Sequence, residues 1–237
     1  MSLPPSSLVQ PRTWRRPQRQ DIKNNGDDSE NKGHGREEEF VISTDPRLLS
    51  IQAINAAYAM DFLYWAKPFP ENELRQILSG SLCFGVYRYD RRNNKTSASP
   101  GHADTSIAPD EVEQIGMARL VTDTVTFAYL TDVYVLPAYQ SRGLGSWLLD
   151  CVAETLSVDN MPHLRRVMLL TSSQKSDGGK AERFYERKLG VEAKGWEVRE
   201  DLGGKVLAIM VRKGAVPAPS GEGADGDNDD MNAQRTV

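Results

Sequence analysis

The sequence predicts an α/β fold, with one domain at residues 37–213 of a chain of 237 residues. Two features of the pattern support this prediction. Segments with apolar residues at helical spacing alternate with short runs that have strand character. The two ends of the chain are polar and contain too few large apolar side chains to offset the entropy of folding. The structured segment of about 175 residues therefore suits a single hydrophobic core.

We expect the elements in the order β-α-α-β-β-β-α-β-α-β-β. The expected strands are residues 39–43, 82–89, 114–121, 125–136, 166–171, 196–199 and 205–211. The expected helices are residues 46–59, residues 71–78, the segment that follows the glycines at 143 and 145, and residues 180–189. The strands at 114–121 and 125–136 are close enough in sequence to form a tight hairpin.

The segment from Asp132 to Leu149, DVYVLPAYQSRGLGSWLL, carries the clearest chemical signal. A strand leads into Gln140, Gly143 and Gly145, and the helix that follows presents backbone N–H groups that can bind a pyrophosphate. A P-loop would need a lysine and a hydroxyl residue after the second glycine, and a dinucleotide-binding loop would need a third glycine and a later acidic residue. Neither pattern is present. We therefore expect another phosphate-bearing cofactor, the alternative being a glycine turn between strand and helix.

The loop resembles the motif Q/R-x-x-G-x-G/A of the GNAT (GCN5-related N-acetyltransferase) superfamily. Further blocks at residues 64–67, 81–87, 116–123 and 126–135 resemble one small GNAT subgroup without a settled substrate. The resemblance covers roughly residues 37–213. It implies a central mixed, mostly antiparallel twisted sheet of about seven strands flanked by about four helices. It also implies acetyl-CoA as the co-substrate and an amine as the acceptor.

The resemblance also assigns coenzyme contacts to this sequence. Val133 and Val135 would pair with the pantetheine arm, and backbone N–H groups near Val135 or Leu136 would face the thioester oxygen. Ser172 or Ser173 stands where the family has a helpful asparagine, and Ser173 is the candidate for a hydrogen bond to the pantetheine. The pyrophosphate would lie on a loop made of Gln140, Ser141, Arg142, Gly143, Leu144, Gly145 and Ser146, with a side-chain contact from Arg142.

Tyr185 is the candidate general acid. The helix KAERFYERKLG places it where GNAT enzymes often carry a tyrosine that faces the coenzyme sulfur, in the pattern A-x-x-F/L-Y-x-x-x-G. A phenol with a pKa of about 10 is protonated at neutral pH and can give its proton to the departing thiolate. Gly190 departs from the pattern because it follows the tyrosine by five residues instead of four. The alternative is a tyrosine that only packs beside Phe184.

The sequence does not specify the general base. Tyr129 and Thr131 occupy strand positions at which many family members carry Glu or His, and Tyr129 is a candidate to orient a water molecule. Asp132 is the carboxylate of this strand. Alternation directs Asp132 to the opposite face unless the splay of the strand rotates it. The alternative for Asp132 is a buried ion pair with Arg119 on the neighbouring strand.

Tyr64 and Trp65, between the first two helices, are candidates to wall the acceptor site, with core packing as the alternative. The three histidines form no metal-binding pattern, so we expect no metal. The sequence therefore predicts an acetyl-CoA-dependent N-acetyltransferase that moves acetyl directly to a primary amine of a small molecule, or of a protein or peptide. The alternative from another class is a non-catalytic GNAT-like module that binds acyl-CoA or a partner.

The ends of the chain are expected to be disordered, with a basic tail at residues 1–36, an acidic tail at residues 214–237 and a mobile insertion at about residues 90–113. The formal net charge of −4 hides this asymmetry. Four arginines within residues 12–19 are more typical of a solvated tail than of a nucleic-acid contact. No apolar run is long enough to span a membrane. Two cysteines in apolar settings favour a reducing compartment. We expect a cytoplasmic monomer or homodimer, with the nucleus as an alternative and organellar import disfavoured by the N-terminal prolines.

Overall fold

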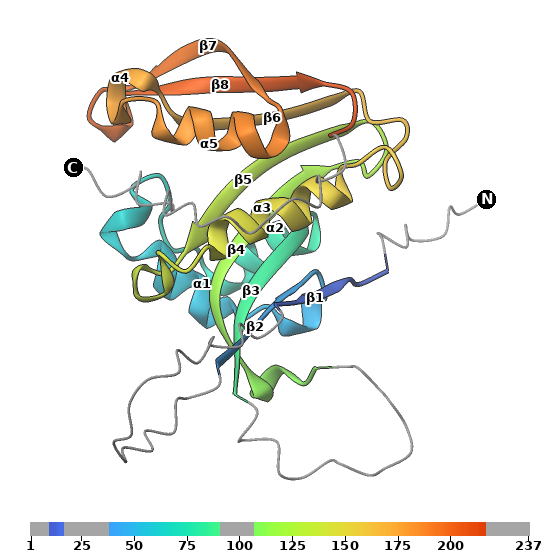
Figure 1. Ribbon diagram of the computed structural model, residues 1–237. Coiled ribbons are helices and arrows are strands. Elements are labelled where there is room, and N and C mark those ends of the chain that lie inside the picture. Colours follow the sequence, from blue (N-terminus) through green and yellow to red (C-terminus); the bar gives the residue numbers. More distant parts are fainter. Residues whose placement is uncertain (1–9, 17–37, 91–106, 217–237) are drawn as a thin grey trace, which may run out of the picture.

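The computed structural model describes residues 10–16, 38–90 and 107–216, and Figure 1 shows how the elements are arranged. One eight-stranded sheet runs through the described part of the chain, in the order β1-β2-β3-β4-β5-β6-β8-β7. Neighbouring strands are antiparallel except for β5 and β6, which are parallel. The predicted mixed, mostly antiparallel sheet is confirmed, with one strand more than expected.

The bounds of the elements are as follows. The strands are β1 (Thr13–Arg15), β2 (Glu38–Ser43), β3 (Leu82–Asp90), β4 (Val112–Thr122), β5 (Phe127–Val135), β6 (Arg166–Ser172), β7 (Glu192–Arg199) and β8 (Lys205–Lys213). The α-helices are α1 (Ile51–Tyr58), α2 (Glu71–Ser79), α3 (Leu144–Thr155), α4 (Gln174–Asp177, a single turn) and α5 (Lys180–Leu189). Within the described ranges no helix is long and apolar enough to cross a membrane.

Helices cover both faces of the sheet. On one face, α1 and α2 bury Ile54 and Leu74 in a cluster that includes Met117 of β4. On the other face, α3 and α5 contribute Leu148 and Leu189 to the largest core cluster. Figure 1 shows these two layers, with α3 crossing the lower part of the sheet and α5 lying against the upper part formed by β6, β8 and β7. The sheet is therefore buried on both sides around its middle.

The first strand corrects the predicted disorder of residues 1–36 for the part that the structure describes. Thr13–Arg15 pairs antiparallel with the outer edge of β2. Trp14 supplies the stabilisation: its ring stacks on Phe84 with a centroid separation of 5.9 Å, and its indole Nε1 donates to Glu154 Oε2 at 2.8 Å. One aromatic side chain and a sheet edge thus order a segment that its own composition does not. Apart from residues 10–16 and 214–216, the two predicted tails lie outside the described residues.

Two other boundaries differ from the prediction. The helix expected at 46–59 is a short 3-10 turn at Pro46–Leu48 followed by α1 from Ile51, because Ser50 is extended and its hydroxyl caps the helix by accepting from the Ala53 N–H at 3.2 Å. The predicted insertion at 90–113 lies outside the described residues at 91–106. Its last part is ordered, since a 3-10 turn at Pro109–Glu111 leads directly into β4.

The parallel strands β5 and β6 separate along their length. Their register runs from Phe127 opposite Arg166 to Leu130 opposite Leu169 and ends there, although both strands continue. The separation coincides with an irregularity in β5: the register with β4 shifts between Met117 and Arg119, and Asp132 has a φ of +51°. A bulge of this kind bends and twists a strand. The sheet therefore opens into a gap between the ends of β5 and β6.

Candidate active site

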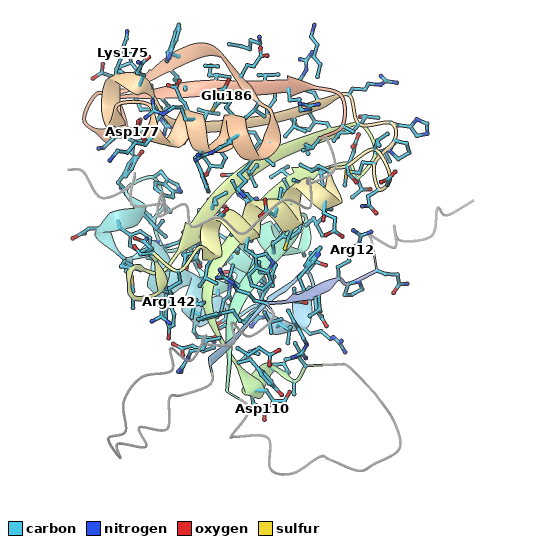
Figure 2. The ribbon with its side chains drawn as sticks, viewed as in Figure 1. Arg12, Asp110, Arg142, Lys175, Asp177 and Glu186 are labelled. Carbon is cyan, nitrogen blue, oxygen red and sulfur yellow. The ribbon has the colours of Figure 1, made fainter. Side chains whose placement is uncertain are left out.

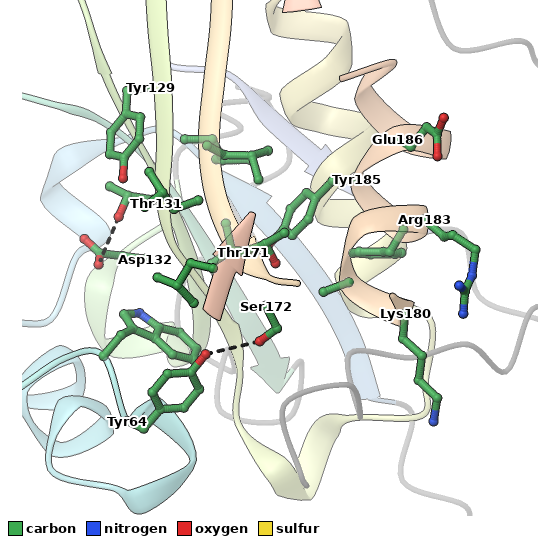
Figure 3. Close-up of a pocket in the computed structure, with 18 of the residues that line it drawn as sticks. Tyr64, Tyr129, Thr131, Asp132, Thr171, Ser172, Lys180, Arg183, Tyr185 and Glu186 are labelled. Carbon is green, nitrogen blue, oxygen red and sulfur yellow. Dashed lines mark hydrogen bonds between the residues drawn. The ribbon is translucent and has the colours of Figure 1, made fainter. Parts of the chain in front are cut away.

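A cavity of about 620 Å³ occupies the gap between β5 and β6. Five parts of the chain surround it, as Figure 3 shows in close-up. The lining residues are Tyr64 and Trp65 before α2, residues 129–133 of β5, residues 169–172 of β6, Lys180, Ala181 and residues 183–187 of α5, and Arg199 and Leu207 of β7 and β8. The structure thus brings together Tyr64, Trp65, Tyr129, Asp132, Val133 and Tyr185 from the sequence-predicted site.

The backbone of β5 offers hydrogen-bonding groups to this gap. The N–H of Leu136 donates to the carbonyl of Ile115 on β4 at 2.8 Å. Because successive N–H groups of a strand point in opposite directions, the N–H of Val135 is directed away from β4 and toward the gap. The expectation that Leu136 offers an N–H to a thioester is therefore wrong, and Val135 is the better candidate.

The predicted phosphate loop forms at the end of β5. Gln140 holds the loop to the strand, since its Nε2 donates to the Val135 carbonyl at 2.9 Å. Ser141 and Gly143 have φ values of +63° and +68°, and Gly143 is the N-cap of α3. The first intrahelical bond of this turn joins the Trp147 N–H to the Gly143 carbonyl at 3.1 Å. The N–H groups of residues 144–146 therefore have no acceptor within the helix and are directed out of its N-terminus.

Arg142 does not extend freely from this loop. Its Cζ lies 5.3 Å from the ring centroid of Tyr139 and 5.9 Å from that of Phe40 on β2. The guanidinium is therefore held over two aromatic faces. A direct contact of the Arg142 side chain with a phosphate stays a prediction.

Tyr185 lies on the inner face of α5. Its side chain is 7% exposed, and Figure 3 shows its ring pointing from the helix into the cavity. Burial and the neighbouring Tyr64 raise the pKa of Tyr185 well above its ordinary value. The shift noted at Gly190 is accommodated by the helix end: α5 continues to Leu189, and Gly190 closes it in the left-handed conformation with a φ of +61°.

Asp132 forms the ion pair that the sequence left as an alternative. Its Oδ2 accepts from Arg119 Nε at 2.6 Å, and the two side chains are 13% and 17% exposed. Its Oδ1 accepts from the Thr131 hydroxyl at 3.5 Å. Arg119 also donates to the Ser81 hydroxyl at 3.1 Å. Both oxygens of Asp132 are thus engaged, although the residue lines the cavity.

Hydroxyl groups line the remaining wall of the cavity. The Tyr64 hydroxyl and the Ser172 hydroxyl are 3.2 Å apart, so a loop beside α2 is joined to the end of β6. Tyr129 lines the cavity beside β6, and burial raises its pKa. Ser173 is fully buried, and its Oγ has no hydrogen-bond partner among the described residues. Ser173 directly follows Ser172, which lines the cavity, but Ser173 itself is not among the lining residues.

Several cavity residues gave no local signal in the sequence. Arg183 and Arg187 belong to an amphipathic helix in which charged residues are ordinarily solvent-exposed, and Arg199 is the last residue of an edge strand. Only the pairing of β7 with β8, and of β8 with β6, carries Arg199 to the cavity. Among the described residues no group of three or more His, Cys, Asp or Glu is placed to hold a metal ion.

Comparison with known proteins identifies relatives. A model of the acetyltransferase (GNAT) family matches residues 63–191. A Gibberella zeae protein named as a candidate acetyltransferase is 44% identical over 136 residues, which are 57% of this chain and 73% of that protein. A solved candidate GNAT acetyltransferase from Xanthomonas campestris is 30% identical, covering 61% of this chain and 82% of that chain with a TM-score of 0.42. Arabidopsis thaliana NAA60, solved with a bisubstrate analogue, is 14% identical, covering 69% and 92% with a TM-score of 0.46.

Proposed function

This chain belongs to the GNAT acetyltransferase family and is an N-acetyltransferase, and from that premise we propose that it moves the acetyl group of acetyl-CoA directly to a small-molecule primary amine. The observation that carries the proposal is the gap between β5 and β6, which holds a cavity of about 620 Å³ with Tyr185 pointing into it. The phosphate loop lies at the end of the same strand. The turn that would bind the anion therefore follows the same strand, β5, that lines the cavity beside Tyr185.

The residues present fit acetyl-CoA. The N–H groups at the start of α3 would donate to the diphosphate oxygens, an arrangement favoured by the helix dipole by about 0.3–1 kcal/mol per charge. Val133 and Val135 would pair with the pantetheine arm as an added strand, and the orphaned hydroxyl of Ser173 would complete the set of polar contacts. Gln140 acts indirectly, because it fixes the loop against the end of β5.

The reaction follows from these positions. The amine nitrogen attacks the thioester carbonyl carbon, the new C–N bond forms, and the C–S bond breaks. The Val135 N–H stabilises the charge on the carbonyl oxygen. Tyr185 donates its phenolic proton to the departing sulfur; its raised pKa keeps the proton in place at neutral pH. The proton lost by the amine would pass to a water molecule oriented by Tyr129.

Asp132 has a positioning role in this scheme. Its Oδ2 is paired with Arg119 and its Oδ1 accepts from Thr131, so the carboxylate is held against β4 and its charge is already compensated by Arg119. The ion pair instead holds β5 to β4 at the point where β5 bends. Asp132 thereby maintains the opening of the gap.

The cavity wall favours an acceptor of low positive charge. Four of its lining residues are basic (Lys180, Arg183, Arg187 and Arg199), and two are acidic (Asp132 and Glu186). Because Arg199 is paired with Asp201 and the lining residues Arg183 and Arg187 are solvent-exposed, this balance leaves a modest excess of positive charge, which favours compounds that carry an anionic group beside the amine. We therefore place small amines with a carboxylate or phosphate ahead of polyamines and basic peptides.

The test begins with calorimetric titration of acetyl-CoA into the full chain, with adenosine diphosphate as the control. Binding in the micromolar range, well above the control, is expected. Release of coenzyme thiol is then measured with amino acids, amino phosphates, spermidine and a lysine peptide. Both cysteines are buried and burial raises their thiol pKa values, that of Cys83 to about 12, so protein thiols contribute little signal. Absence of acetyl-CoA binding would refute the proposal, and turnover of spermidine above all anionic amines would refute the acceptor class.

A further inference from the structure

One ion pair of the cavity wall is largely removed from solvent. Many charged side chains lie at the surface: Figure 2 labels Asp110 and Lys175, which are exposed at opposite ends of the molecule. Arg119 and Asp132 are only 17% and 13% exposed, and Asp132 lines the cavity. A guanidinium at such a site needs acceptors for its N–H groups, because few water molecules reach it. The groups that hold Arg119 therefore determine the position of Asp132.

Arg119 has a second side-chain acceptor, the hydroxyl of Ser81. Its Nη1 donates to Ser81 Oγ at 3.1 Å, while its Nε donates to Asp132 Oδ2 at 2.6 Å. Two nitrogens of the planar guanidinium are thus held by groups from different parts of the chain. Two contacts fix the rotation of this rigid plane, whereas the contact to Asp132 alone would leave the guanidinium free to turn.

Ser81 is itself fixed by the end of α2. Its backbone N–H donates to the Leu78 carbonyl at 3.2 Å, and its Oγ donates to the Ile77 carbonyl at 2.9 Å. A serine hydroxyl has one proton and two lone pairs, so the proton given to Ile77 leaves the lone pairs to face Arg119. The last turn of α2 therefore presents a fixed acceptor to the guanidinium.

Arg119 lies where β5 bends. It pairs with Thr131 directly after the shift of register that begins at Met117, and Asp132 follows with a φ of +51°. Beyond the bend, the N–H of Val135 is directed into the gap between β5 and β6. The direction of this N–H depends on the angle at which β5 leaves the bend. The contacts that begin at the end of α2 therefore reach the part of β5 that faces the cavity.

We propose that Ser81 is a positioning residue for acetyl transfer, which fixes the Arg119 guanidinium and thereby holds Asp132 and the bend of β5. The inference rests on the proposed function, in which the Val135 N–H faces the thioester oxygen. Ser81 is not among the residues that line the cavity, so it acts through Arg119. The end of α2 thus contributes to the geometry of the reaction without contacting the substrates.

The test compares Ser81→Ala with Ser79→Ala in the full chain, using the amine with the highest turnover in the panel above. Both serines donate to a carbonyl in the last turn of α2, Ser79 to Gln76 at 2.9 Å, but of the two Ser81 is the one that also accepts from Arg119. Ser81→Ala should lower kcat about fivefold, less than the loss of about a hundredfold when an oxyanion donor is removed, because the Val135 N–H is loosened but still present. The Kd of acetyl-CoA should change less than twofold, since the phosphate loop is unaltered. Ser79→Ala should change neither quantity by more than about twofold.

A double variant tests the route through Arg119. Arg119→Lys keeps the charge opposite Asp132 but lacks the planar fork, so Ser81→Ala should cause no further loss of kcat in that background. A further fivefold loss there would overturn the proposal, as would equal kcat values for wild type and Ser81→Ala or equal losses in Ser81→Ala and Ser79→Ala. The wild type separates the two hypotheses. If it neither binds acetyl-CoA nor acetylates an amine, the proposed function fails; if it is active and Ser81→Ala matches it, the role of Ser81 alone fails.

Discussion

Replacing Asp132 by Asn should destabilise the protein while leaving the chemistry of a folded enzyme largely intact. Asn is a fitting substitute because it tolerates the left-handed conformation, which Asp132 adopts with a φ of +51°. The substitution removes the charge that Arg119 Nε contacts at 2.6 Å, and the two side chains are only 13% and 17% exposed. Breaking a fully buried ion pair costs about 3–5 kcal/mol. Partial exposure reduces this to about 2–4 kcal/mol of unfolding free energy.

The assay is urea unfolding combined with a pH profile of kcat/KM for the best amine. At about 2–4 °C per kcal/mol for a domain of this size, the melting temperature should fall by about 4–16 °C. Glu113→Gln is the matched control, because its ion pair with Arg88 is 50% and 27% exposed and should contribute less than about 1 kcal/mol. A stable Asp132→Asn protein that has lost turnover more than about a hundredfold, together with the low-pH limb of its pH profile, would refute the positioning role and identify Asp132 as the base.

Three further predictions follow from the same geometry. Tyr185→Phe should lower kcat about 10²-fold while changing acetyl-CoA affinity less than twofold, because only proton donation to the thiolate is lost. Steady-state assays of coenzyme thiol release measure kcat, and an unchanged kcat would exclude the acid role. Gly190→Ala should lower the free energy of unfolding by about 1–2 kcal/mol, since its φ is +61° and the new Cβ would be 2.3 Å from Arg212 Nη1. Gly203→Ala, with a φ of +69° and open space around the new Cβ, should lose only the free energy of the backbone strain. Urea unfolding of the two variants measures the difference. Burial raises the pKa values of four tyrosines, Tyr58, Tyr87, Tyr134 and Tyr185. The contribution of these neutral phenols to the free energy of unfolding is therefore fully present below the unfolded pKa of about 10 and is lost as pH rises beyond it. Phenolate absorbance that titrates fully while the protein remains folded would contradict this.

Elements whose signals are local were predictable from the sequence. The bounds of α5 match the prediction because Gly190 ends the helix in the left-handed conformation and the apolar spacing of Tyr185 and Leu189 defines its buried face. The loop at Gly143 was predictable for the same reason. The start of α1 was not, because Ser50 interrupts a helical pattern with a cap that competes successfully with helix continuation.

Features that depend on distant pairing were not predictable. Residues 13–15 have the composition of a polar tail, and they become a strand only because β2 offers an edge and Glu154 and Phe84 receive Trp14. The orientation of Asp132 is a second case. Simple alternation would separate it from Tyr129, but the bulge beside Arg119 places both on the cavity wall. The position of a bulge depends on the register between two strands, so the sequence of either strand alone does not indicate it.

The same distinction explains why the sequence indicates the coenzyme more clearly than the amine. The phosphate loop and the adjacent strand lie within one continuous segment, so their spacing alone predicts a diphosphate site. The acceptor wall is assembled from the loop before α2, from α5, and from the strands β7 and β8, and none of these segments has a defined function by itself. Selectivity for the amine is therefore determined by how these segments pack, and variants at Arg183, Arg187 or Arg199 should change the acceptor preference while leaving acetyl-CoA affinity nearly constant.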